Sequence, residues 1–112
     1  MTLFEKIAAR EVPARIIHET DEFLAFHDVH PQAPVHVLIV PRRVIPRVAA
    51  CTSADAGLLG RMLVAAPEIA RQLGLAETGF RIVINNGPDA GESVPHLHIH
   101  LLGGRGLQWP PG

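Results

Sequence analysis

Apolar residues recur at helical spacing in two stretches of the chain. The first stretch is Leu3–Arg10, where the apolar positions follow a three-and-four-residue period. Thr2 stands before it and Glu5 follows three residues later, which is the pattern of a capping box. Because proline cannot continue a helix, Pro13 sets a limit on this short N-terminal helix.

The second helical stretch is long and extends to Gly74. Thr52 or Ser53 is its expected N-cap, and Gly74 is its expected terminator. Pro67 lies inside the periodic run. Since proline lacks an N–H and crowds the preceding turn, we expect Pro67 to kink the helix or to divide it.

Five further segments have the composition of strands. The first two are separated by Thr20-Asp21, which predicts a hairpin. The chain has no alternation of strand and helix and no glycine-rich phosphate motif, so a dinucleotide-binding or P-loop fold is excluded. We therefore predict a single α+β domain, residues 1–112, with a five-stranded antiparallel sheet, one short N-terminal helix and one long helix. The predicted strands are Arg15–Glu19, Glu22–Asp28, Val35–Val40, Gly79–Ile84 and His96–Leu102.

Composition narrows the function classes. Ten basic and eleven acidic side chains give a net charge of -1 without a basic stripe, which argues against nucleic-acid binding. No apolar run is long enough to span a bilayer, and charges appear too early for a signal peptide, so we expect a cytoplasmic protein. Cys51 is the only cysteine, which excludes an intrachain disulfide and a cysteine-rich zinc site.

The most informative segment is His96-Leu97-His98-Ile99-His100. On an extended chain, alternate side chains point to opposite faces, and alternate histidines lie about 6.6 Å apart. The three imidazoles then share one face and the apolar residues pack on the other. Such a face is open to three interpretations: ordinary structural histidines, a metal site, or catalysis on an anion. The density of histidines favours catalysis, since neutral imidazole is a good nucleophile near pH 7.

The histidine segment and its surroundings resemble the histidine-triad superfamily, and within it the HINT-like branch of nucleotide-binding proteins. The similarity covers nearly the whole chain, and its strength comes from several blocks in order. Besides the histidine segment these are Phe23–Asp28, Pro31–Pro34, Val37–Pro41, Gly91–Val94, Leu102–Arg105 and Trp109–Gly112.

The resemblance implies roles for four histidines. His98 corresponds to the nucleophile, which attacks the α-phosphorus of a nucleotide to give a covalent nucleotidyl-histidine. A backbone carbonyl near His96 is expected to hold the other ring proton of His98 and so to fix its tautomer. His100 and His36 correspond to histidines that contact the phosphate, and either is a candidate to protonate the leaving amine. His96 is expected to orient its neighbours.

The resemblance also implies a nucleotide pocket. Asp28 corresponds to the acid that accepts hydrogen bonds from the ribose hydroxyls. The implied phosphate-binding residues are Asn85, Gly91, Ser93 and Val94. The implied base pocket consists of Phe4, Ile7, Val12, Phe26, Val29 and Leu38. His30 stands where many relatives carry a small polar residue.

The resemblance favours a hydrolase that cleaves the P–N bond of purine nucleoside phosphoramidates such as adenosine 5′-monophosphoramidate, with no metal or other cofactor. The alternatives are a dinucleoside polyphosphate hydrolase, a nucleotide-binding regulatory protein and a metalloprotein. Relatives that cleave dinucleoside polyphosphates usually carry glutamine in place of His100. A homodimer is also implied, with the two sheets joined and the tail of each chain, including Trp109, near the partner's site.

Overall fold

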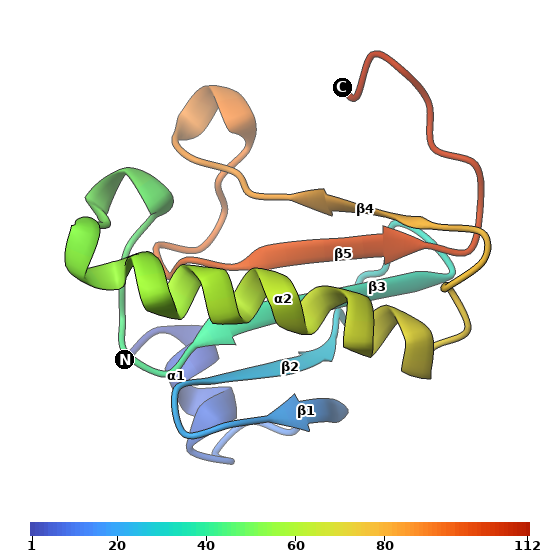
Figure 1. The fold of residues 1–112 in the computed structure, drawn as a ribbon. Coiled ribbons are helices and arrows are strands. Elements are labelled where there is room, and N and C mark those ends of the chain that lie inside the picture. The colour runs from blue at the N-terminus through green and yellow to red at the C-terminus, as the bar shows by residue number, and fades with distance from the viewer.

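The computed structural model describes all 112 residues and has the predicted α+β architecture (Figure 1). Five antiparallel strands form one sheet in the order β1-β2-β3-β5-β4. The helices are α1 (Leu3–Ala8) and α2 (Ala56–Gln72), and the strands are β1 (Ile16–Glu19), β2 (Phe23–His27), β3 (Val35–Pro41), β4 (Phe80–Val83) and β5 (Ile99–Gly103).

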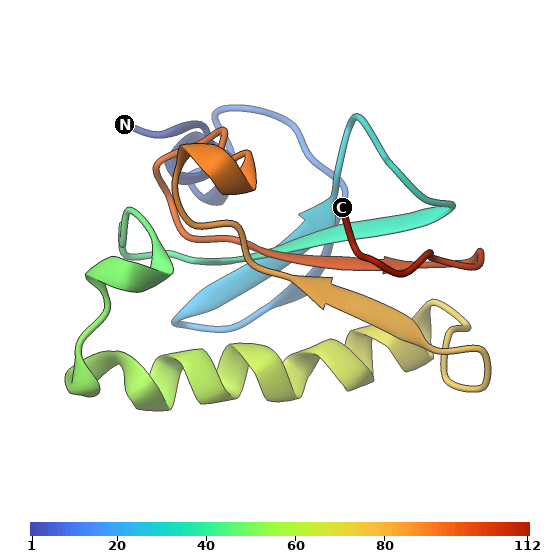
Figure 2. The ribbon, with the colours of Figure 1, turned by 90° about the horizontal axis from the view of Figure 1, so that it is seen from above.

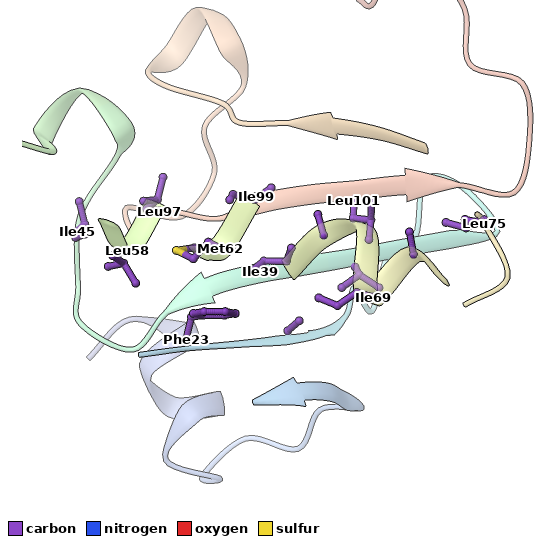
Figure 3. Close-up of a cluster of buried hydrophobic side chains, with 14 residues drawn as sticks. Phe23, Ile39, Ile45, Leu58, Met62, Ile69, Leu75, Leu97, Ile99 and Leu101 are labelled. Carbon is purple, nitrogen blue, oxygen red and sulfur yellow. The ribbon is translucent and has the colours of Figure 1, made fainter. Parts of the chain in front are cut away.

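The two helices cover opposite faces of the sheet (Figure 2). Helix α2 packs on the face that presents Val37, Ile39, Ile99 and Leu101, and together they form the larger buried cluster (Figure 3). Helix α1 contributes to a smaller cluster on the other face, which consists of Phe4, Ile7, Leu24, Phe26, Leu38 and Val40. The face covered by α2 is therefore the main core, and the face carrying α1 is left partly free for a site.

The predicted cap of α1 is present, whereas Thr52 caps a 3-10 turn before α2, and the N-cap of α2 itself is Asp55, whose side chain forms no capping bond with that helix. The Thr2 side chain accepts a hydrogen bond from the Glu5 N–H, and the Glu5 side chain accepts one from the Thr2 N–H. Thr52 and Asp55 form the same reciprocal pair at a 3-10 turn, Ser53–Asp55, that leads into α2. Each pair satisfies N–H groups that have no partner within the helix.

Of the two outcomes expected at Pro67, a kink or a division, the division does not occur, because α2 is one continuous element from Ala56 to Gln72. Pro67 itself is exposed. The carbonyl that loses its usual N–H partner is that of Leu63, four residues earlier, and Leu63 is also exposed. Water can hydrate that carbonyl, so the helix tolerates the proline.

The last strand begins later than predicted, at Ile99 rather than His96. Its pairing with β3 stops at Ile39↔Ile99. Beyond this point Pro41 has no N–H to continue the ladder, and the Leu97 N–H donates instead to the Ile45 carbonyl at 2.6 Å. His96 and His98 therefore lie on an irregular segment that leads into β5.

Candidate active site

A cavity of about 270 Å³ lies between α1, the end of β2 and the histidine segment. All six residues predicted for the base pocket line it, as do Ser93 and Val94. Leu3, Pro13, Ala14 and His27 also line the cavity and were not predicted, because the sequence does not show how α1, the segment after it and the end of β2 pack together. His30 lies on the same wall and is exposed. The complete wall consists of Leu3, Phe4, Ile7, Val12, Pro13, Ala14, Phe26, His27, Asp28, Val29, His30, Leu38, Ser93, Val94, His98 and His100.

His98 is held in one tautomer by its own backbone neighbourhood. Its Nδ1 lies 2.7 Å from the His96 carbonyl oxygen. A carbonyl only accepts, so Nδ1 carries the proton and Nε2 carries the lone pair when the ring is neutral. No protein group forms a hydrogen bond with Nε2, and His98 lines the cavity. The expected carbonyl near His96 is thus present, and the free nitrogen is available to a ligand.

His96 is almost fully buried and bonded through both ring nitrogens. Its Nε2 lies 2.7 Å from the Pro41 carbonyl, and its Nδ1 lies 2.6 Å from the Thr2 hydroxyl. The Phe4 ring lies edge-on to His96 and His98, with centroid distances of 5.5 and 5.0 Å. His96 does not line the cavity, and its orienting role stays a prediction.

His36 and His100 form a second fixed pair. The Gln32 N–H donates to His36 Nδ1 at 3.0 Å, which leaves the proton of a neutral His36 on Nε2. That nitrogen lies 2.9 Å from His100 Nδ1 and 3.5 Å from an Asp28 carboxylate oxygen. His100 Nδ1 therefore accepts a hydrogen bond from His36 Nε2–H, so a neutral His100 carries its proton on Nε2. This nitrogen is buried without a protein partner, on a side chain that lines the cavity.

Burial keeps the supporting histidines neutral. Burial lowers the pKa of His100 to about 4, and the neighbouring His98 and His36 add to this effect. Burial likewise lowers the pKa of His36, although Asp28 opposes it, and lowers the pKa of His96. At neutral pH these three rings therefore have the hydrogen-bond directions deduced above.

The predicted phosphate-binding residues are only partly brought together. Ser93 and Val94 line the cavity, whereas Asn85 and Gly91 do not. The loop between β4 and the histidine segment is held by Glu92, which pairs with Arg47 at 2.9 and 3.0 Å and accepts from the Gly87 N–H. Contact of Asn85 and Gly91 with a phosphate stays a prediction.

One group of side chains has the proximity of a metal site. Asp28, His36 and His100 each offer a ligand atom, and these atoms lie within 4.8 Å of one another. His36 and His100 already share a hydrogen bond through two of their nitrogens. A cation between them would have to break it. The function proposed below uses no metal.

The family model described as HIT domain matches residues 9–107. This chain belongs to the HIT domain family. An uncharacterized HIT-like protein of Synechocystis sp. is 53% identical over 99% of this chain and 96% of the relative. A second, from Synechococcus elongatus, is 54% identical with the same coverage.

Solved structures of the family have the same fold. A HIT family hydrolase from Legionella pneumophila superposes with a TM-score of 0.97 at 44% identity, and each chain is covered completely. A histidine triad nucleotide-binding protein from Candida albicans gives a TM-score of 0.83 at 29% identity, over 98% of this chain and 83% of that one. None of the helices in this chain is long and apolar enough to cross a membrane.

Proposed function

We propose that this HIT protein is a nucleoside phosphoramidate hydrolase that acts through a covalent nucleotidyl intermediate on His98. The observation that carries the proposal is the fixed tautomer of His98, whose Nδ1–H is bonded to the His96 carbonyl while Nε2 is free on a cavity wall. A hydrolase and a nucleotide-binding protein among the similar structures support the same reaction class.

In the proposed reaction, His98 Nε2 attacks the α-phosphorus, the P–N bond breaks, and the amine leaves with a proton taken from the solvent. Water then attacks the phosphorus of the nucleotidyl-histidine, the bond to His98 breaks, and the proton lost by this water returns to the solvent. The net change is phosphoramidate plus water to nucleoside monophosphate plus free amine. His98 is regenerated in its starting tautomer because the His96 carbonyl still holds the Nδ1 proton.

His100 is the proposed donor to the phosphoryl oxygens. Its Nε2 is buried and has no protein partner, and a preorganised donor of this kind stabilises charge that develops in the transition state. His36 does not line the cavity. We therefore assign His36 to the support of His100 rather than to direct contact with the phosphate.

The apolar part of the cavity is the proposed site of a purine base. Phe4, Ile7, Phe26 and Leu38 form one buried cluster below it, and Asp28 stands beside it with its carboxylate half-buried. We propose that the base packs on these residues and that Asp28 accepts from the ribose hydroxyls. The homodimer, with Trp109 near the partner's site, is part of the same proposal.

The test is intact-mass spectrometry of the protein quenched during turnover of adenosine 5′-monophosphoramidate. An adenylyl adduct that maps to His98 is expected, and His98→Asn should lose both the adduct and at least about a thousandfold in kcat/KM. His18→Asn is the matched control, because His18 stacks on Phe23 outside the cavity. Unchanged turnover in His98→Asn contradicts the proposal.

A further inference from the structure

One hydroxyl group forms a hydrogen bond between the start of the N-terminal helix and the histidine segment. Thr2 Oγ1 accepts a hydrogen bond from the Glu5 N–H at 3.1 Å and lies 2.6 Å from His96 Nδ1. The residues that meet here are 94 positions apart in the chain. A helix cap needs only a hydrogen-bond acceptor, so helix capping alone does not explain the contact of Thr2 with His96.

The direction of this hydrogen bond follows from the groups around it. Pro41 offers His96 only a carbonyl, so His96 Nε2 carries the proton. A neutral His96 then has a lone pair at Nδ1, and burial lowers the pKa of this ring. Thr2 must therefore donate its one hydroxyl proton to His96 while its oxygen accepts from Glu5.

His96 needs this second anchor because no strand pairing holds it. Strand β5 starts only at Ile99. The His96 carbonyl nevertheless has to stay 2.7 Å from His98 Nδ1 to keep the proton there. Bonds from the His96 ring to Pro41 at the end of β3 and to Thr2 at the start of α1 fix the residue that carries this carbonyl.

We propose that Thr2 is a positioning residue for the nucleophile, acting through His96 to hold His98 in the tautomer with a free Nε2. The expected effect of Thr2 on kcat rests on the proposed function. The Thr2 hydroxyl can both accept from Glu5 and donate to His96 through one oxygen atom. Aspartate at this position keeps the cap but has no proton for the neutral ring.

Three substitutions at Thr2 and one at Glu5 separate positioning from capping. Thr2→Ser keeps both bonds, Thr2→Asp keeps only the cap, and Thr2→Val loses both. Glu5→Ala removes the other half of the capping box and leaves the bond from Thr2 to His96 in place. With adenosine 5′-monophosphoramidate, we expect Thr2→Ser and Glu5→Ala to stay within roughly twofold of the wild-type kcat.

Loss of one such hydrogen bond should lower kcat about tenfold in Thr2→Asp and Thr2→Val, with KM nearly unchanged. ¹⁵N NMR of the imidazole rings in the ligand-free protein provides a second measurement. In the wild type, His96 should carry its proton on Nε2 and His98 on Nδ1. In Thr2→Asp, His96 should lose the hydrogen bond at Nδ1, and the His98 ring should populate both tautomers.

Two results would overturn the proposal. One is a wild-type kcat together with an unchanged His98 tautomer in Thr2→Asp, which would make Thr2 only a helix cap. The other is a loss of kcat in Glu5→Ala as large as in Thr2→Val, which would assign the effect to helix stability. If the wild-type protein does not turn over the phosphoramidate, the proposed function fails, and the NMR comparison still decides whether Thr2 sets the tautomer.

Discussion

His36 Nε2 lies 2.9 Å from His100 Nδ1, and this contact decides which nitrogen of His100 carries the proton. His36 is the donor in this hydrogen bond because its other ring nitrogen, Nδ1, accepts from the Gln32 N–H. A backbone group on the loop before β3 thus determines the hydrogen-bonding character of a side chain in the site.

His36→Phe should lower kcat about tenfold with adenosine 5′-monophosphoramidate, because His100 Nδ1 loses its donor and the ring is free to change tautomer. His36→Gln is the matched control, since its amide nitrogen can donate from a position near that of Nε2. Steady-state kinetics of the two variants measure the difference. Equal activity of the phenylalanine variant and the wild type would count against the supporting role.

Asp28→Asn should weaken kcat/KM about tenfold or more, because a hydrogen bond to a charged acceptor is stronger than one to an amide. Asp28 also lies 3.5 Å from His36, so the activity of the variant alone does not measure the ribose contact. A 2′,3′-dideoxy substrate isolates this contact, because it lacks the ribose hydroxyls. We expect it to be poor for the wild type and to suffer little further loss in Asp28→Asn, and strict additivity of the two losses would contradict ribose recognition.

Lowering the pH should destabilise the fold already at pH values above those at which carboxylates titrate. The pKa of His100 is lowered from 6.5 to about 4 by burial. Between these values the unfolded chain binds more protons than the folded chain, so stability falls as the pH drops from about 7 towards 4. His36 and His96, whose pKa values are also lowered, act in the same direction.

Thermal unfolding at pH 7.5 and pH 5.0 measures this effect. The midpoint of the wild type should be lower at pH 5.0, and the difference should be smaller in His100→Asn, which retains the lowered pKa values of His27, His36 and His96. The groups that face His100 are His36, His98 and Asp28. A midpoint that is the same at both pH values would refute the assignment of buried neutral histidines.

The proposed homodimer predicts a dimer mass in light scattering at micromolar concentration. Trp109 is the only tryptophan and is 81% exposed in the single chain. If its tail lies against a partner, its fluorescence should shift to the blue relative to an exposed indole, and dilution to monomer should reverse the shift. A monomer mass at micromolar concentration would contradict the dimer.

The sequence by itself determined the elements and the candidate chemistry. Spacing of apolar residues predicted both helices, and Thr2 with Glu5 predicted the first cap, because these signals act over one or two turns. Alternation at His96–Leu101 predicted which residues face the core, and Leu97, Ile99 and Leu101 are indeed in the larger buried cluster. The family resemblance added the roles of the histidines.

Only the tertiary structure decided how those histidines are held. Pro41 and Thr2 meet His96 across 55 and 94 positions of the chain, and such contacts have no local signature in the sequence. The Gln32 N–H reaches His36 four positions away through the shape of the loop before β3. Tautomers depend on which donor or acceptor stands opposite each nitrogen. The sequence therefore supplied the four histidines, and the groups that the fold places opposite their ring nitrogens determined where each proton lies.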